Sequence, residues 1–296
     1  MRTWIKRTLV GIGSLVVVAV VAVFALATLG DRKLARHVEV AVVAVPLASD
    51  AASIERGNYL FRSRGCGDCH GANGAGSVVV EDGGMLIRAP NITPGPGGVT
   101  AAYTPADWVR TIRHGVKPNG QPAMVMPSEE YNRYTDADLA AVVAYVRQLP
   151  PKAGEGAIIR LPLPVRVLYA TGMVRDAAEK IDHRLPPARP VAEAVTAEHG
   201  AYVANGCSGC HRADLSGGKV AGAPPSWPAA ARLAPGEGSV MSRYPDAASF
   251  AAMLKTGKRP DGSAVSKVMP FVALREMSDV DVRALHLYLK TMAPPR

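Results

Sequence analysis

The sequence predicts an all-α chain in which an N-terminal transmembrane helix precedes two tandem copies of one small helical domain. Three observations lead to this prediction: an apolar run near the N-terminus, an internal repeat across the remainder, and a composition with 5% aromatic residues but 29 glycines and 24 prolines. Such a composition favours short helices joined by loops over long β-sheets. Hydrophobic residues make up 48% of the chain, which excludes a disordered protein.

The first expected element is the uncharged run at 8–30, TLVGIGSLVVVAVVAVFALATLG. As a helix that rises about 1.5 Å per residue, this run reaches roughly the 30 Å of a bilayer core. The basic residues before it, which are Arg2, Lys6 and Arg7, are typical of the cytoplasmic side. We therefore expect residues 1–30 to anchor the chain in the inner (cytoplasmic) membrane as a single pass, with the rest in the periplasm. A cleaved secretory signal that ends near Ala25-Leu26-Ala27 is the alternative.

The remainder of the chain is a tandem duplication. Each copy opens with a glycine and a tyrosine, continues with Cys-x-x-Cys-His, and later carries a Met-Pro pair nine residues before a hydroxyl residue. These features are Gly57, Tyr59, the motif at 66–70, Met126-Pro127 and Thr135 in the first copy, and Gly200, Tyr202, the motif at 207–211, Met269-Pro270 and Ser278 in the second. We expect domains at 51–152 and 193–296, a linker at 31–50, and a Pro-rich linker at 153–192.

Each copy is expected to close with a helix. Thr135 and Ser278 are N-cap residue types, and acidic residues follow each of them in the first turn. Shorter helices are expected at 54–64, 105–114, 196–205 and 246–256, and one more within 165–180. A glycine in each opening helix and a tyrosine in each closing helix suit two helices that cross closely. These residues are Gly57 and Tyr145 in the first copy, and Gly200 and Tyr288 in the second.

The two Cys-x-x-Cys-His motifs indicate covalently bound haem. Two thiols at this spacing can each add to one vinyl group of a haem, and the histidine that follows then becomes an axial ligand of the iron. The residues concerned are Cys66, Cys69 and His70, and Cys207, Cys210 and His211. A redox dithiol, a disulfide or a four-thiolate zinc site is the alternative use of Cys-x-x-Cys, but none of these needs a histidine at the same place twice. We therefore expect two haem c groups as cofactors.

Met126 and Met269 are the candidates for the sixth iron ligand, because a thioether closes the distal face of a haem iron. Both stand at matched places in the repeat, each behind a loop that contains glycine. Met124 is the local rival of Met126. Two closed irons predict an electron carrier. An open iron would instead indicate a di-haem enzyme, such as a peroxidase or a sulfur-compound oxidase.

Each copy resembles a class I c-type cytochrome domain, which has an opening helix with glycine and an aromatic residue, Cys-x-x-Cys-His, and a methionine before a closing helix. The resemblance implies that a proline carbonyl accepts a hydrogen bond from the haem histidine and orients its ring. Pro90, in Ala89-Pro90-Asn91-Ile92, fits this role. The second copy has Ala230-Ala231-Arg232-Leu233 instead, without the proline.

Residues 89–94 (APNITP) and 181–183 (IDH) are similar to stretches in the cytochrome c subunits of bacterial membrane-bound dehydrogenases for alcohols, aldehydes or sugar acids such as gluconate. This resemblance covers about 51–296. It implies single-electron relay in a periplasmic respiratory chain, by an electron-transfer subunit of an oxidoreductase complex rather than an enzyme on its own. Those subunits commonly carry three haems, whereas this chain has motifs for two. The layout also resembles the cytochrome subunit of cbb3-type terminal oxidases, which is the alternative.

The formal net charge of +9 bears on the partners. Positive charge steers acidic redox proteins and favours an anionic membrane surface. We expect dehydrogenase subunits, a terminal oxidase or a quinone-linked complex as redox partners, together with the membrane. Nucleic acid is not expected as a partner of an exported protein.

Overall fold

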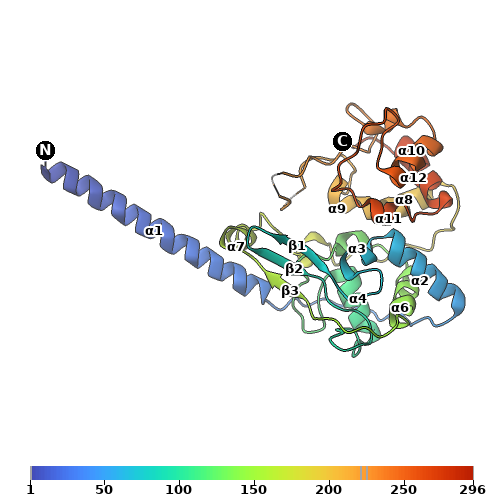
Figure 1. The fold of residues 1–296 in the computed structure, drawn as a ribbon, viewed down its shortest axis with the longest axis horizontal. Helices are drawn as coiled ribbons and strands as arrows, with labels where there is room; N and C mark the ends of the chain where they lie inside the picture. The colour runs from blue at the N-terminus through green and yellow to red at the C-terminus, as the bar shows by residue number, and fades with distance from the viewer. Residues whose placement is uncertain (1, 221, 225, 296) are drawn as a thin grey trace.

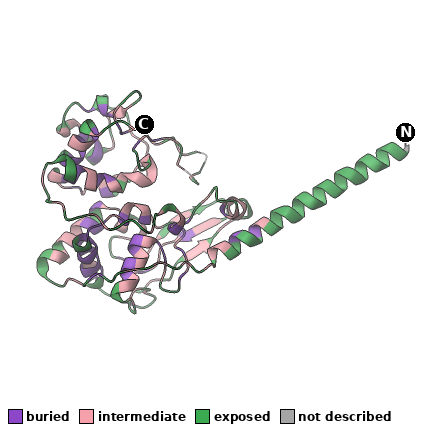
Figure 2. Cartoon of the chain, turned by 180° about the vertical axis from the view of Figure 1, so that it is seen from behind, coloured by how far each residue is buried: buried purple, intermediate pink, exposed green. Residues whose placement is uncertain are grey.

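The computed structural model describes residues 2–220, 222–224 and 226–295. A single long helix, α1 (Arg2–Leu34), projects from two helical domains (Figure 1). None of the most apolar stretch of α1 is buried, and Figure 2 shows most of this helix as exposed. The helix is therefore long and apolar enough to cross a membrane, and it is not a core helix of either domain.

Domain 1 is built around the crossing of its opening and closing helices. Its helices are α2 (Ala51–Ser63), α3 (Cys66–His70), α4 (Pro105–His114), α5 (Ser128–Tyr131) and α6 (Asp136–Arg147). A Cβ at Gly57 in α2 would collide with the carbonyl of Ala141 and with Tyr145 in α6. The close crossing predicted from the glycine and tyrosine pattern is thus confirmed. The Thr135 side chain caps α6 by accepting a hydrogen bond from the Asp138 backbone N–H.

Domain 2 repeats this arrangement. Its elements are α8 (Ala197–Ala204), η2 (Asn205–Cys207), α9 (Ser208–His211), η3 (Val240–Arg243), α10 (Ala247–Thr256), α11 (Phe271–Leu274) and α12 (Asp279–Thr291). Gly200 in α8 faces Ala284 and Tyr288 in α12, as Gly57 does in domain 1. Ser278 caps α12 in the same way as Thr135 caps α6. The predicted helices lie within a few residues of their expected bounds.

Domain 1 also carries a small antiparallel sheet, which corrects the all-α prediction. Its strands β1 (Val78–Asp82), β2 (Met85–Arg88) and β3 (Ile158–Arg160) pair in the order β1-β2-β3. The β1–β2 hairpin turns at Gly83 and Gly84, both with positive φ, which is the backbone that a two-residue hairpin loop requires. β-branched residues in β1 and β3 suit a pleated surface. The third strand comes from the stretch expected to be a linker.

The last turns of α1 are fixed to domain 1. They pack along α7 (Leu163–Ala170), the helix expected within 165–180, and next to η1 (Ala178–Lys180). Arg36 contacts the buried Asp176 at 2.6 Å, and Lys33 contacts Glu179 at 2.9 Å. The chain that follows α1 lies in an extended form on the domain, where Val45 joins its core. Domain 1 is therefore held at the end of the projecting helix.

Candidate haem sites

Domain 1 contains a cavity of about 740 Å³ at its Cys-x-x-Cys-His motif. We call each of the two Cys-x-x-Cys-His motifs an attachment motif, after the haem attachment predicted from the sequence. Cys66, Cys69 and His70 line it, together with Met124 and Met126. Its remaining walls are mainly apolar and aromatic, and they include Phe61, Trp108, Tyr131 and Tyr134. An apolar cavity with two thiols and an imidazole at its wall fits a covalently attached haem.

The His70 ring is held by a backbone acceptor. Its Nδ1 lies 2.9 Å from the Pro90 carbonyl oxygen, so Nε2 is the ring nitrogen that remains available to a metal. Burial lowers the pKa of His70, although the bond to Pro90 opposes this effect, and the neutral form is the one that ligates metal. Burial also raises the pKa of the Cys66 thiol to about 12. The contact between His70 and the Pro90 carbonyl is the one that the resemblance to c-type cytochromes implies.

Domain 2 presents the same arrangement without a proline. Nδ1 of His211 lies 2.7 Å from the carbonyl oxygen of Ala231. Burial lowers the pKa of His211 and raises that of Cys207 to about 12. The acceptor is a backbone oxygen, which any residue can supply, so the missing proline does not remove this contact. Both histidines are therefore oriented in the same way.

The two candidate methionine ligands end matching loops. Val116 pairs with Pro122 in domain 1, and Lys258 pairs with Ala264 in domain 2, each as an isolated antiparallel bridge. After each loop, the methionine carbonyl accepts a 2.8 Å bond from the residue two places on, and the proline between them precedes the short helix α5 or α11. Met124, the rival of Met126, is buried with 7% of its surface exposed. The backbone around Met126 therefore corresponds to the backbone around Met269.

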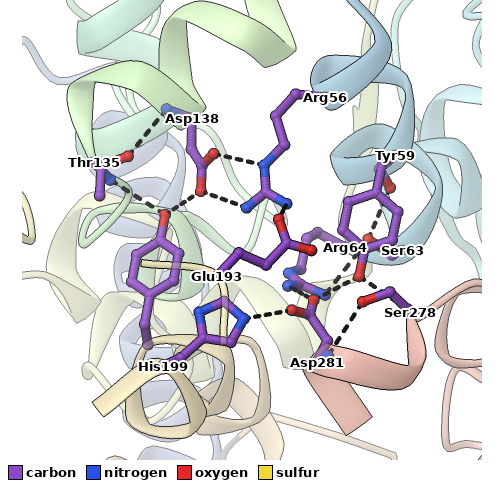
Figure 3. A network of polar contacts seen from close by, with 11 residues as sticks. Arg56, Tyr59, Ser63, Arg64, Thr135, Asp138, Glu193, His199, Ser278 and Asp281 are labelled. Atoms are coloured by element: carbon purple, nitrogen blue, oxygen red, sulfur yellow. Dashed lines mark hydrogen bonds and ion pairs between the residues drawn. The ribbon is translucent and has the colours of Figure 1, made fainter. Parts of the chain in front are cut away.

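The two domains meet in two reciprocal sets of hydrogen bonds, each centred on a tyrosine hydroxyl (Figure 3). The Tyr59 hydroxyl of domain 1 donates to Asp281 of domain 2 at 2.5 Å and accepts from the Ser278 backbone N–H at 3.0 Å. The Tyr202 hydroxyl of domain 2 donates to Asp138 at 2.6 Å and accepts from the Thr135 N–H at 3.3 Å. Each tyrosine thus reaches the start of the closing helix in the other domain. We call these contacts the tyrosine latch.

Basic side chains complete the latch on both sides. Arg56 donates two bonds to Asp138 within domain 1, and His199, which stands at the matched place in domain 2, contacts Asp281 at 2.7 Å. Arg64 adds an ion pair to Asp281 at 2.5 Å, across the boundary. Burial opposes ionisation of Asp281, but Arg64, Tyr59 and His199 outweigh it and lower the pKa of this carboxyl group. The latch is therefore centred on two buried carboxyl groups, Asp138 and Asp281.

The same boundary brings the attachment motifs of the two domains together. Helix α5, which follows Met126-Pro127, packs against η2 and α9 of domain 2. Helix α11, which follows Met269-Pro270, packs against α2 and α3 of domain 1. Each domain therefore places the segment after its candidate methionine ligand on the other domain's Cys-x-x-Cys-His motif.

Comparison with known proteins agrees with this geometry. The family model for cytochrome c matches residues 54–150 and 197–293, one stretch in each domain. The chain belongs to the cytochrome c family. Both Cys-x-x-Cys-His motifs and both Met-Pro pairs lie inside the matched stretches. The two domains are thus tandem cytochrome c domains, and membership in this family implies electron transport with covalently bound haem.

Several relatives of this cytochrome c chain are subunits of dehydrogenases. It is 28% identical over 270 residues to the cytochrome c subunit of the quinone alcohol dehydrogenase of Gluconobacter oxydans, with 82% of this chain and 55% of the relative covered. It is 31% identical over 140 residues to the fructose dehydrogenase cytochrome subunit of Gluconobacter japonicus, with 45% and 29% covered. A diheme cytochrome c-type protein of Cereibacter sphaeroides is 26% identical over 261 residues, with 79% and 84% covered. The chain therefore spans about half the length, or less, of these dehydrogenase subunits.

The latch is not predicted from the sequence. The signal was present, because Tyr59 and Tyr202 stand at matched places in the repeat, as Asp138 and Asp281 do. A tyrosine on a half-buried helix does not reveal that its hydroxyl reaches another domain. His114 ends α4, as expected, and its Nδ1 lies 3.0 Å from Nδ1 of His183.

Proposed function

We propose that this chain is a membrane-anchored di-haem cytochrome c that relays single electrons in a periplasmic respiratory chain, as a subunit of or partner to a membrane-bound dehydrogenase. The observation that carries the proposal is the pair of matched histidines, His70 and His211, each oriented by a backbone carbonyl beside two thiols. The names of the relatives support a dehydrogenase complex as the setting. Helix α1 supports the anchor, with its basic start in the cytoplasm.

In each domain, the cysteines, the histidine and the methionine have different proposed roles. When bound, haem c supplies a one-electron iron couple. We propose that Cys66 and Cys69 hold one haem by thioether bonds, and that Cys207 and Cys210 hold the other. His70 and His211 would bind the iron through Nε2, and Met126 and Met269 would supply its second protein ligand, which would leave no open site for a small ligand. We place the two units at 51–152 and 193–296.

The number of haems and their closure test the proposal. A pyridine haemochrome assay against protein concentration is expected to give about two haems per chain, and replacement of both Cys66 and Cys69 by Ala about one. The reduced protein should not bind carbon monoxide. Met126→Ala and Met269→Ala should each allow carbon monoxide to bind at one haem, because the thioether that closes the site is gone.

Met124→Ala is the matched control for Met126→Ala, and it should leave carbon monoxide binding absent. If Met124→Ala instead allows carbon monoxide to bind, Met124 rather than Met126 is the ligand. If the unmodified protein already binds carbon monoxide at one haem and consumes peroxide, it is a di-haem enzyme and the relay proposal is wrong.

A further inference from the structure

A carboxyl group of domain 1 lies against the attachment motif of domain 2. Glu130 belongs to α5, which contacts η2 and α9 across the domain boundary. Its Oε1 takes the space that a Cβ at Gly209 would need, so the carboxyl group lies on the backbone between Cys207 and Cys210. Its charge also acts on Cys69 of domain 1. Glu130 thus belongs to domain 1 and lies against the attachment motif of domain 2.

The repeat-matched position in domain 2 has no ionisable side chain. It is Ala273 in α11, which is 3% exposed and packs against α2 and α3 of domain 1. A Cβ at Gly65, next to Cys66, would lie 4.0 Å from the Ala273 Cβ. The two matched positions therefore both face the other domain's motif region but meet it at different residues, Gly209 and Gly65, and of the two only Glu130 brings a group that can gain or lose charge.

The surroundings of Glu130 favour its neutral form. Burial, reinforced by the neighbouring Glu129, raises the pKa of Glu130 to about 8, against the opposing effects of Lys180 and the Gly209 N–H. Lys180 is already paired with Glu129 at 2.9 Å. The titratable or charged groups around Glu130 are Glu129 and Tyr131 on α5, Lys180 on η1, Cys69 on α3, Cys207 on η2 and Cys210 on α9. Thioether formation removes the three cysteines from this set.

We propose that Glu130 couples electron transfer through the haem pair to the release and uptake of one proton. The inference rests on the proposed function, since it requires both motifs to carry haem. Passage of one electron from either site to a one-electron acceptor protein oxidises ferrous iron to ferric iron, reduces the acceptor, and adds one positive charge. Release of the Glu130 proton to water leaves a carboxylate that offsets this charge. Re-reduction reverses both steps.

Spectroelectrochemical titration of the full-length holoprotein in detergent, between pH 6 and 10, tests the coupling. The sum of the two midpoint potentials is expected to fall as pH rises through the region near 8, because ferric iron favours the carboxylate. At full coupling, the electron affinity changes by about tenfold per pH unit. Glu130→Gln keeps the size of the side chain but cannot ionise. Its midpoint sum should stay flat over this range and lie above that of the unmodified protein at high pH.

Glu129→Gln is the matched control on the same helix. It should keep the pH dependence but move it to lower pH, because removal of the neighbouring negative charge lowers the pKa of Glu130. The proposal is overturned if Glu130→Gln shows the same pH dependence as the unmodified protein. It is also overturned if Glu129→Gln abolishes the pH dependence and Glu130→Gln does not. A haemochrome count near two for all three proteins separates these results from a failure of the proposed function, which would show as a lower count in the unmodified protein.

Discussion

Asp281 has no exposed surface, and its carboxylate accepts hydrogen bonds or ion pairs from Tyr59, Arg64 and His199. A buried carboxylate is costly unless it is paired, and here two of its three partners come from the other domain. Residue identity alone placed Asp281 in the first turn of a helix, where the helix dipole favours a negative charge. Its contacts with Tyr59 and Arg64 arise only where the domains meet.

The lowered pKa of Asp281 predicts how stability depends on pH. Because the folded-state pKa lies below the ordinary value of 3.8, the ionised group stabilises the fold above that value, and this contribution is lost as pH falls through the folded-state pKa. Asp281→Asn should destabilise the protein at pH 7 by about 3 kcal/mol or more, since Arg64 loses its buried partner. Its urea midpoint should also vary less than that of the unmodified protein below pH 4.

Urea unfolding of the holoprotein at several pH values measures both effects. Asp279→Asn is the control, because Asp279 lies two residues away on the same helix with 82% of its side chain exposed. Equal unfolding curves for the Asp281 and Asp279 variants would contradict this role for the latch.

At the scale of elements, caps and periodicity predicted the helices well. Thr135 and Ser278 cap α6 and α12, and α4 begins at Pro105 and ends at His114, as expected. The β-hairpin was not predicted, because its strands are short and a composition argument excludes only long sheets. Its third strand is supplied by Ile158–Arg160, far along the chain, and no local pattern reveals such a pairing.

Gly57→Ala and Gly200→Ala should each destabilise one domain by about 1 to 3 kcal/mol, because the added Cβ collides with the closing helix. In an open helix, the same change would stabilise by about 0.5 to 1 kcal/mol, so the sign of the effect reports the close crossing. Gly156→Ala is the control, since a Cβ there meets nothing within 4 Å. Thermal unfolding of the three variants gives the comparison, and a gain in stability for Gly57→Ala would show that α2 and α6 do not cross so closely.

At the scale of the whole molecule, the latch joins two domains that could each form a core alone. The cores are separate clusters, around Leu139 in domain 1 and around Leu285 in domain 2. The tyrosine latch and the exchange of α5 and α11 contacts connect them through a repeat-matched pair of surfaces. The two attachment motifs are therefore held in one fixed relation rather than on a flexible tether.

Combined Tyr59→Phe and Tyr202→Phe should uncouple the domains. Each change removes a hydroxyl that bonds a buried carboxylate, at a cost of about 1.5 to 3 kcal/mol. Calorimetry of the holoprotein should show one coupled transition for the unmodified protein and two separate transitions for the double variant. Tyr288→Phe is the control, because Tyr288 packs against Gly200 inside domain 2. A single transition in all three proteins would mean that other contacts suffice to couple the domains.

The sequence by itself determined the apolar helix, the duplication, the two Cys-x-x-Cys-His motifs and the capped closing helices, because each depends on residue type at fixed spacing. Only the tertiary structure decided which groups lie opposite one another. The acceptor for His211 is the backbone carbonyl of Ala231, which the residue type at that position does not indicate. The placement of Glu130 on the other domain's motif depends on how the two cores meet. Local chemistry can be predicted from short motifs. Contacts between distant residues depend on how the two cores pack, which short motifs do not determine.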